Sequence, residues 1–81
     1  MKVYTLERID MDGNLLADSC VRVYTSYELA KESMVSMYKT LINAGDIHYY
    51  NPPKDSNRCA VCYTYGKFVT IKIKETTVEE V

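Results

Sequence analysis

Both faces of the C-terminal hairpin are apolar, and this feature constrains the fold more than any other. Residues 59–74 form two strand-like runs on either side of Gly66. Because side chains alternate between the two faces of a strand, one face is expected to carry Ala60, Cys62, Thr64, Val69, Ile71 and Ile73. The other is expected to carry Val61, Tyr63, Tyr65, Phe68, Thr70, Lys72 and Lys74. One helix covers only one face of a sheet, so the second apolar face indicates a further partner.

The first third of the chain predicts another hairpin. Asp12-Gly13 separates two runs that are rich in β-forming residues, and an Asp-Gly pair in that position is a strong turn signal. A two-residue loop would pair Tyr4 with Val21, whereas a three-residue loop with a bulge would pair Val3 with Val21. Both registers stay open from the sequence.

The middle of the chain predicts a helix over residues 26–44. We expect its start to be a capping box, in which Thr25 accepts from the Glu28 amide and the Glu28 side chain returns to Thr25. Tyr24 and Leu29 then stand at the two positions of a hydrophobic staple.

This helix carries one apolar stripe, formed by Tyr27, Ala30, Met34, Met37, Tyr38, Leu41 and Ile42. We interpret the stripe as the core face, because the helix is the only predicted cover for the sheet. An adaptable peptide groove built on Met34 and Met37 is the weaker alternative. Gly45 is expected to end the helix in a left-handed conformation.

Proline and glycine residues predict two further connections between elements, a loop and a turn. Residues 46–57 predict a long loop, because Pro52-Pro53 excludes regular structure there. Long loops in small domains are often functional. Gly66-Lys67 fits a type II′ turn, which favours glycine at its first position.

These elements predict an α+β fold in the order ββαββ, with a four-stranded, mainly antiparallel sheet and one helix packed on one face. The 81 residues give room for one domain. We expect that domain to span residues 1–75 and a frayed acidic tail to follow over residues 76–81.

Composition narrows the class of protein. The net charge is −1 at pH 7, which argues against binding dominated by nucleic-acid phosphates. No apolar run approaches the ~20 residues that a membrane helix needs, and the N-terminus lacks the pattern of a secretion signal. Three cysteines, an odd number, fit free thiols in a reducing compartment. We therefore expect a cytoplasmic protein without membrane contact.

Cys59 and Cys62 have the spacing of a zinc knuckle or a redox pair. In a strand, however, two side chains three residues apart point to opposite faces. A zinc site would need two more ligands, for which only Cys20 and His48 stand out. We expect structural thiols and no cofactor, with a small metal-binding protein as a minor alternative.

Two other stretches could carry chemistry. The acidic stretch 10–14 begins like a calcium loop, but Leu15 and Val21 occupy the positions where that loop needs glycine and glutamate, so we expect a polar turn. His48, Tyr49 and Tyr50 are secondary candidates on the predicted long loop. A general base needs an oriented partner, and no nucleophile or paired-carboxylate motif accompanies the histidine in the sequence. We expect no enzymatic activity.

The aromatic face of the C-terminal hairpin is therefore the main functional candidate. Tyrosine is enriched at protein interfaces, which favours a protein-binding module, and we expect it to be homodimeric through the open sheet face or its edge strand. The residues expected to contact the partner are Val61, Tyr63, Tyr65, Lys67, Phe68 and Lys72. Inhibitors of larger assemblies, as encoded by accessory and mobile elements, are one form of such a module, although no residue singles out that role.

Two alternative roles for this face stay open. Rings rimmed by lysines are also the platform on which single-stranded nucleic acids stack. Alternatively the patch is internal and residues 46–57 cover it, with Tyr49 and Tyr50 packed against it.

Overall fold

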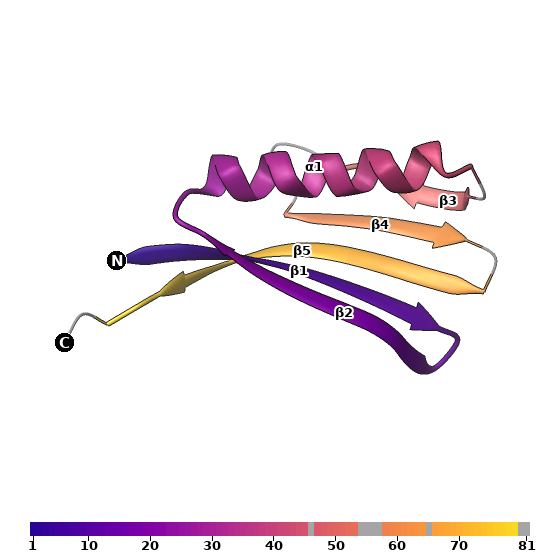
Figure 1. The fold of residues 1–81 in the computed structure, drawn as a ribbon, viewed down its shortest axis with the longest axis horizontal. Coiled ribbons are helices and arrows are strands. Elements are labelled where there is room, and N and C mark those ends of the chain that lie inside the picture. The colour runs from indigo at the N-terminus through magenta and orange to yellow at the C-terminus, as the bar shows by residue number, and fades with distance from the viewer. Residues whose placement is uncertain (46, 54–57, 65, 80–81) are drawn as a thin grey trace.

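The computed structural model describes residues 1–45, 47–53, 58–64 and 66–79 (Figure 1). Its elements are β1 (Lys2–Asp12), β2 (Leu15–Tyr24), α1 (Tyr27–Asn43), β3 (Ile47–Asn51), β4 (Cys59–Thr64) and β5 (Lys67–Thr77). The strands form one five-stranded sheet in the order β2-β1-β5-β4-β3, and every neighbouring pair is antiparallel. The α+β class is confirmed, but the sheet has five strands where we predicted four.

The additional strand, β3, lies inside the predicted loop over residues 46–57. It pairs with β4, with Tyr49 opposite Tyr63 and Asn51 opposite Val61. Pro52-Pro53 follows the strand directly, so the prolines end a short edge strand and do not exclude one. The order of elements is therefore ββαβββ, and the predicted ββαββ order is wrong.

The first hairpin is present, but neither predicted register is correct. Tyr4 pairs with Tyr24, and the register shifts between Asp10 and Met11. Gly13 has a φ of +60° and opens a two-residue connection between the paired residues Asp12 and Leu15. Ala17 has no partner in β1 and forms a bulge in β2. Neither predicted register included this additional residue.

Helix α1 starts one residue later than the predicted capping box. Ser26 is the N-cap, and its side-chain oxygen accepts from the Leu29 amide at 3.2 Å. The capping box at Thr25 and the staple are therefore wrong, since Leu29 remains 48% exposed. The Tyr24 hydroxyl instead donates to Ser33 Oγ at 2.8 Å and ties β2 to the helix.

The end of α1 follows the expectation. Gly45 has a φ of +95°, and its amide donates to the Ile42 carbonyl at 3.2 Å. This left-handed glycine satisfies a carbonyl in the last turn and ends the helix.

The core lies between α1 and one face of the sheet. It is formed by Leu6, Ala30, Met34, Tyr38, Ala60, Cys62, Val69, Ile71 and Ile73. The predicted helix stripe supplies three of these residues, and its other members pack against them. Met34 is fully buried, so the core interpretation is confirmed over the peptide groove.

The second hairpin turns one residue earlier than predicted. Thr64 pairs with Lys67, so Lys67 belongs to β5 and Gly66 stands second in the connection, with a φ of +82°. The predicted Gly66-Lys67 type II′ turn is therefore wrong.

The sheet also continues beyond the predicted domain boundary at residue 75. Thr76 and Thr77 pair with Val3 and Lys2, and the Val78 amide donates to the Met1 carbonyl at 2.7 Å. The frayed tail expected from residue 76 is wrong for these residues, because the start of the chain binds them.

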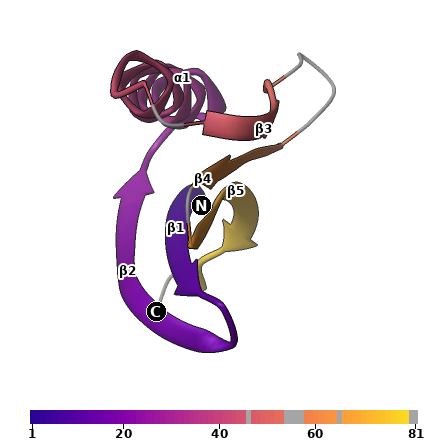
Figure 2. The same ribbon diagram turned by 90° about the vertical axis from the view of Figure 1, so that its right-hand side faces the viewer.

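The molecule is elongated, measuring 46 × 26 × 17 Å along its principal axes. Seen end-on, α1 lies on one side of the sheet and the turn of the β1–β2 hairpin lies far from it (Figure 2). In the described part of the chain, α1 is too short and too polar to cross a membrane.

Candidate protein-binding surface

The strand registers define which residues share the side of the sheet that α1 does not cover, which we call the open face. It carries Glu7, Ile9, Met11, Ser19, Val21, Val23, Tyr49, Cys59, Val61, Tyr63, Phe68, Thr70, Lys72 and Lys74. The predicted division of the C-terminal hairpin into a core face and an aromatic face is confirmed for its described residues. The buried residues of β4 and β5 all belong to the first set.

Four rings gather on the open face at the β3–β4–β5 side, and we call them the aromatic cluster: His48, Tyr49, Tyr63 and Phe68. The Tyr63 and Phe68 ring centroids are 6.2 Å apart with their planes at 52°. The His48 and Tyr63 centroids are 6.3 Å apart. Each contact has the tilted geometry that aromatic pairs favour over flat stacking.

A bulge explains why His48 joins this cluster. The register of β3 shifts between Ile47 and Tyr49, so His48 and Tyr49 both stand opposite Tyr63. A bulge places consecutive side chains nearer to one face and bends the strand. The His48 ring thereby lies against the Tyr63 ring.

The cluster remains accessible to a partner. Tyr49 is 57% exposed, Tyr63 is 43% exposed and Phe68 is 40% exposed. Of the segment 46–57 that could cover the patch, residues 47–51 form β3 and place Tyr49 beside Tyr63, whereas residues 46 and 54–57 lie outside the described residues. An apolar surface of this kind on a small domain typically marks an interaction site.

The remaining predicted contact residues divide between the two faces. Val61 is half-buried on the open face next to the cluster, and Lys72 lies on the same face opposite Glu7. Lys67 alternates with Phe68 and so belongs to the helix-covered side. Tyr65 falls outside the described residues.

Tyr50 separates from its predicted companions. Its side chain is on the helix side of β3, and its ring meets Tyr38 of α1 edge-on, with centroids 6.1 Å apart. The secondary candidates therefore divide, with His48 and Tyr49 in the aromatic cluster and Tyr50 outside it.

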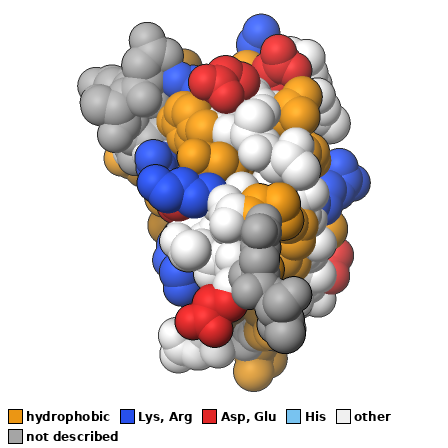
Figure 3. Space-filling view, turned by 90° about the vertical axis from the view of Figure 1, so that its left-hand side faces the viewer, with side chains coloured by type: hydrophobic (Ala, Val, Ile, Leu, Met, Phe, Trp, Pro, Cys, Tyr) orange, Lys and Arg blue, Asp and Glu red, His pale blue; other side chains and the backbone are white. Residues whose placement is uncertain are grey.

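Lys72 and Arg58 each have an acidic residue nearby. Lys72 faces Glu7 across the strand pair. Arg58 lies 5.0 Å from the centre of the Tyr27 ring and 3.6 Å from a Glu75 oxygen. The end of the molecule where α1 begins shows acidic, basic and apolar side chains mixed together and no extended basic patch (Figure 3).

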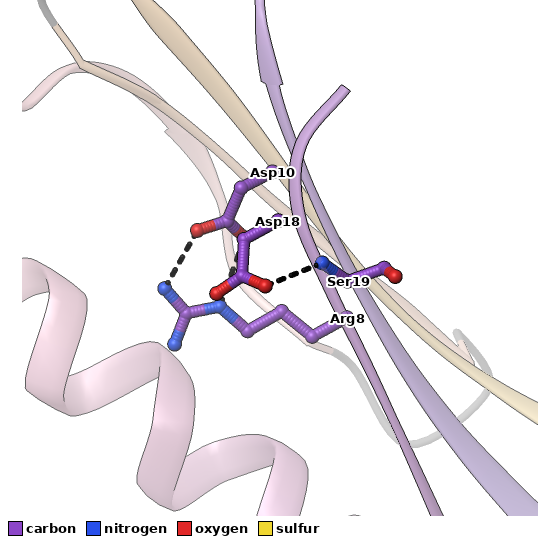
Figure 4. A network of polar contacts seen from close by, with 4 residues as sticks. All are labelled: Arg8, Asp10, Asp18 and Ser19. Carbon is purple, nitrogen blue, oxygen red and sulfur yellow. Dashed lines mark hydrogen bonds and ion pairs between the residues drawn. The ribbon is translucent and has the colours of Figure 1, made fainter.

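The other face of the β1–β2 hairpin holds a polar network (Figure 4). The Arg8 guanidinium donates two hydrogen bonds to the Asp10 carboxylate, at 3.0 and 3.1 Å, and these bonds raise the pKa of Arg8. Asp18 accepts from the Ser19 amide at 2.8 Å. In the stretch that begins like a calcium loop, Asp10 is thus paired with Arg8, β1 extends to Asp12, and only residues 13–14 form the turn.

The cysteines separate as the strand alternation predicts. Cys62 is buried under α1 and its burial raises the pKa of the thiol, whereas Cys59 belongs to the open face. Cys20 lies exposed on β2, with β1 and β5 between it and β4. Within the described residues, no group of three metal-ligating side chains comes together, so the Cys20/His48/Cys59/Cys62 site is not assembled.

The sequence alone did not identify which residues of β2 lie on the open face. Val21 and Val23 are 59% and 64% exposed there, and Leu16, opposite Met11, is 61% exposed. Their alternation with Arg22 is visible in the sequence, but assigning it to a face required the register. Comparison with protein-family models, curated proteins and solved structures finds no significant match to this chain.

Proposed function

We propose that this protein is a small non-enzymatic binding module that recognises a protein partner through the aromatic cluster and associates as a homodimer. The observation that carries the proposal is the exposure of Tyr49, Tyr63 and Phe68 side by side on a sheet. Aromatic residues dominate the energetics of protein interfaces, because they bury large areas at a small cost in side-chain entropy.

The support for a protein partner lies in the composition of the open face. Apolar side chains surround the rings, and Lys72 and Lys74 stand along β5 on the same face. We therefore expect a partner with an apolar centre and an acidic flank. The reduced thiols of Cys20, Cys59 and Cys62 fit a module that works in the reducing cytoplasm.

A photo-crosslinking residue tests what touches the cluster. Tyr63→benzoylphenylalanine places the probe in the cluster, and Glu32→benzoylphenylalanine places a matched probe on the exposed side of α1. We expect adducts with a protein partner from position 63 and not from position 32. Equal labelling from both positions, or nucleic-acid adducts from position 63, would overturn the proposal.

Once the partner is identified, the contribution of the Tyr63 ring to the free energy of binding can be measured. Tyr63→Ala should weaken binding by ~2 kcal/mol or more if this ring is an interface anchor. Tyr50→Ala is the matched control, because Tyr50 is 55% exposed but lies on the other face. Calorimetry that finds equal affinities for both variants and the wild type contradicts the anchor role.

A further inference from the structure

The two edges of the sheet differ in how open they are to another strand. The β3 edge has five residues, contains a bulge and is followed by two prolines. Those are devices that protect an edge from pairing. The β2 edge has ten residues, of which all but Tyr24 are exposed; its own bulge at Ala17 lies near the turn and leaves residues 18–24 in regular register. Strand pairing with another chain is therefore far less hindered at β2.

The hydrogen bonds around Ser19 show which backbone groups of β2 are directed away from β1. The Ser19 amide donates to the Asp18 carboxylate and so is turned to the outside of the sheet. In an antiparallel pair the inward and outward directions alternate along the strand. The amides and carbonyls of Val21 and Val23 consequently point outward as well.

We propose that β2 pairs with β2 of a second copy in antiparallel fashion, with Cys20 opposite Cys20. This inference gives the homodimer of the proposed function its contact surface, and it does not involve the aromatic cluster. In this register Ser19 of one copy and Val21 of the other exchange backbone hydrogen bonds, which uses the outward groups of both residues.

Charge complementarity selects this register. A two-fold axis at Cys20 places Asp18 of each copy opposite Arg22 of the other, and opposite charges across a strand pair are stabilising. A shift of the axis to Asp18 or to Arg22 would oppose like charges. An axis at Ser19 or Val21 leaves both charges without a directly opposed partner.

The Asp18–Ser19 hydrogen bond has a clear part in this assembly. In the free chain Asp18 satisfies the outward amide of Ser19 (Figure 4). On pairing, the Val21 carbonyl of the second copy takes that amide, and the Asp18 carboxylate turns to Arg22. The dimer thereby replaces a local contact with an intermolecular ladder.

The dimer also enlarges the open face. A two-fold axis between antiparallel strands runs perpendicular to the sheet, so both open faces end on the same side. In this register Val21 of each copy stands opposite Ser19 of the other on that side, and within each copy Glu7 and Lys72 lie across β1 and β5 from Val21, between it and β4. A partner with two equivalent sites would bind such a dimer with added avidity.

Charge reversal on the full-length protein tests the register, with sedimentation equilibrium from micromolar to millimolar concentrations as readout. Asp18→Arg alone and Arg22→Asp alone should each weaken dimerisation about tenfold, because every opposed pair becomes like-charged. An equimolar mixture of the two variants should form a heterodimer, since each chain then opposes arginines to aspartates. Absence of that heterodimer would overturn the register.

Val21→Pro provides a variant that is independent of charge. It removes an outward amide and leaves the β1 ladder intact, whereas Val21→Thr keeps the amide and serves as the control. Circular dichroism verifies the fold of each variant. We expect Val21→Pro to be monomeric and Val21→Thr to dimerise. A dimer of Val21→Pro as stable as the wild type would overturn the pairing.

Disulfide trapping locates the axis. In the Cys59→Ser background, diamide oxidises the two facing Cys20 thiols, taking two electrons and two protons as the S–S bond forms. We expect rapid trapping of Cys20 and slow trapping of Ser19→Cys in a Cys20→Ser chain.

If the wild type dimerises but Tyr63→Ala abolishes the dimer and Val21→Pro does not, the β2 inference fails while the proposed function stands. A wild type that stays monomeric overturns the β2 inference, and adducts of Tyr63→benzoylphenylalanine with another protein would still support the aromatic interface.

Discussion

Tyr38 and Tyr63 show how position alone separates a core residue from a surface residue of the same type. Tyr38 is 8% exposed between α1 and the sheet, and burial raises the pKa of its hydroxyl. Within the described residues that hydroxyl is buried without a hydrogen-bond partner. Tyr63 is 43% exposed on the opposite face. The helical period and the strand alternation distinguish these two roles without any contact information.

Glu75, near the C-terminus, makes the free energy of unfolding depend on pH. Its carboxylate is 3.0 Å from Lys2 Nζ and 3.6 Å from Arg58 Nη1. The Lys2 hydrogen bond and charge lower the pKa of Glu75 below its ordinary value of 4.5. The folded protein therefore favours the ionised form, and this contribution is present above pH 4.5 and lost as the pH falls through the folded pKa.

Glu75→Gln removes that contribution. We expect the difference in urea midpoint between the wild type and Glu75→Gln to be largest near neutral pH and to disappear in acid. Thr76→Ser is a nearby control that should show no such pH dependence. A difference between Glu75→Gln and wild type that stays constant from neutral pH to acid would contradict the ion-pair account.

At the scale of elements, the N-terminus of α1 depends on one serine. Ser26→Ala should lower the free energy of unfolding by ~1 kcal/mol, because the side-chain acceptor of the Leu29 amide is lost. Thr25→Ala should change it by less than ~0.5 kcal/mol, since Thr25 is exposed and outside the cap. Chemical denaturation measures both variants. An equal loss for the two would favour the capping box at Thr25.

The same scale shows what could be predicted from the sequence. The helix and the two faces of the β4–β5 hairpin follow from periodicity within each element, which needs no partner. Strand β3 could not be predicted in that way, because its five residues lack a clear alternation and pair at the edge of the sheet with β4. The two prolines that follow β3 also favoured the prediction of a loop.

Register was the second limit. The two-residue loop model paired Tyr4 with Val21, whereas the structure pairs Tyr4 with Tyr24. A shift by an odd number of residues exchanges the faces of a strand, so that model misplaced Val21 relative to β1. The bulge at Ala17 is a feature of the pairing between β1 and β2, and no residue near the turn predicts it from the sequence.

At the scale of the whole molecule, the one helix and five strands of the described residues leave one face of the sheet without a covering element. The core uses one face of the sheet, and the apolar residues of the other face extend from Val21 and Val23 on β2 to Tyr49 on β3. The β2 edge and the aromatic cluster are separate parts of this uncovered region. The first suits pairing with an identical strand and the second suits a partner's apolar surface.

Hydroxyl-radical footprinting of the dilute monomer tests most directly whether the chain leaves its own aromatic face uncovered. Corrected for intrinsic reactivity, Tyr63 and Phe68 should be oxidised at rates close to that of Tyr49 and far above that of Tyr38. If Tyr63 and Phe68 were as protected as Tyr38 under these conditions, the rings would be covered by the chain itself, and the open face would have no surface to offer a partner.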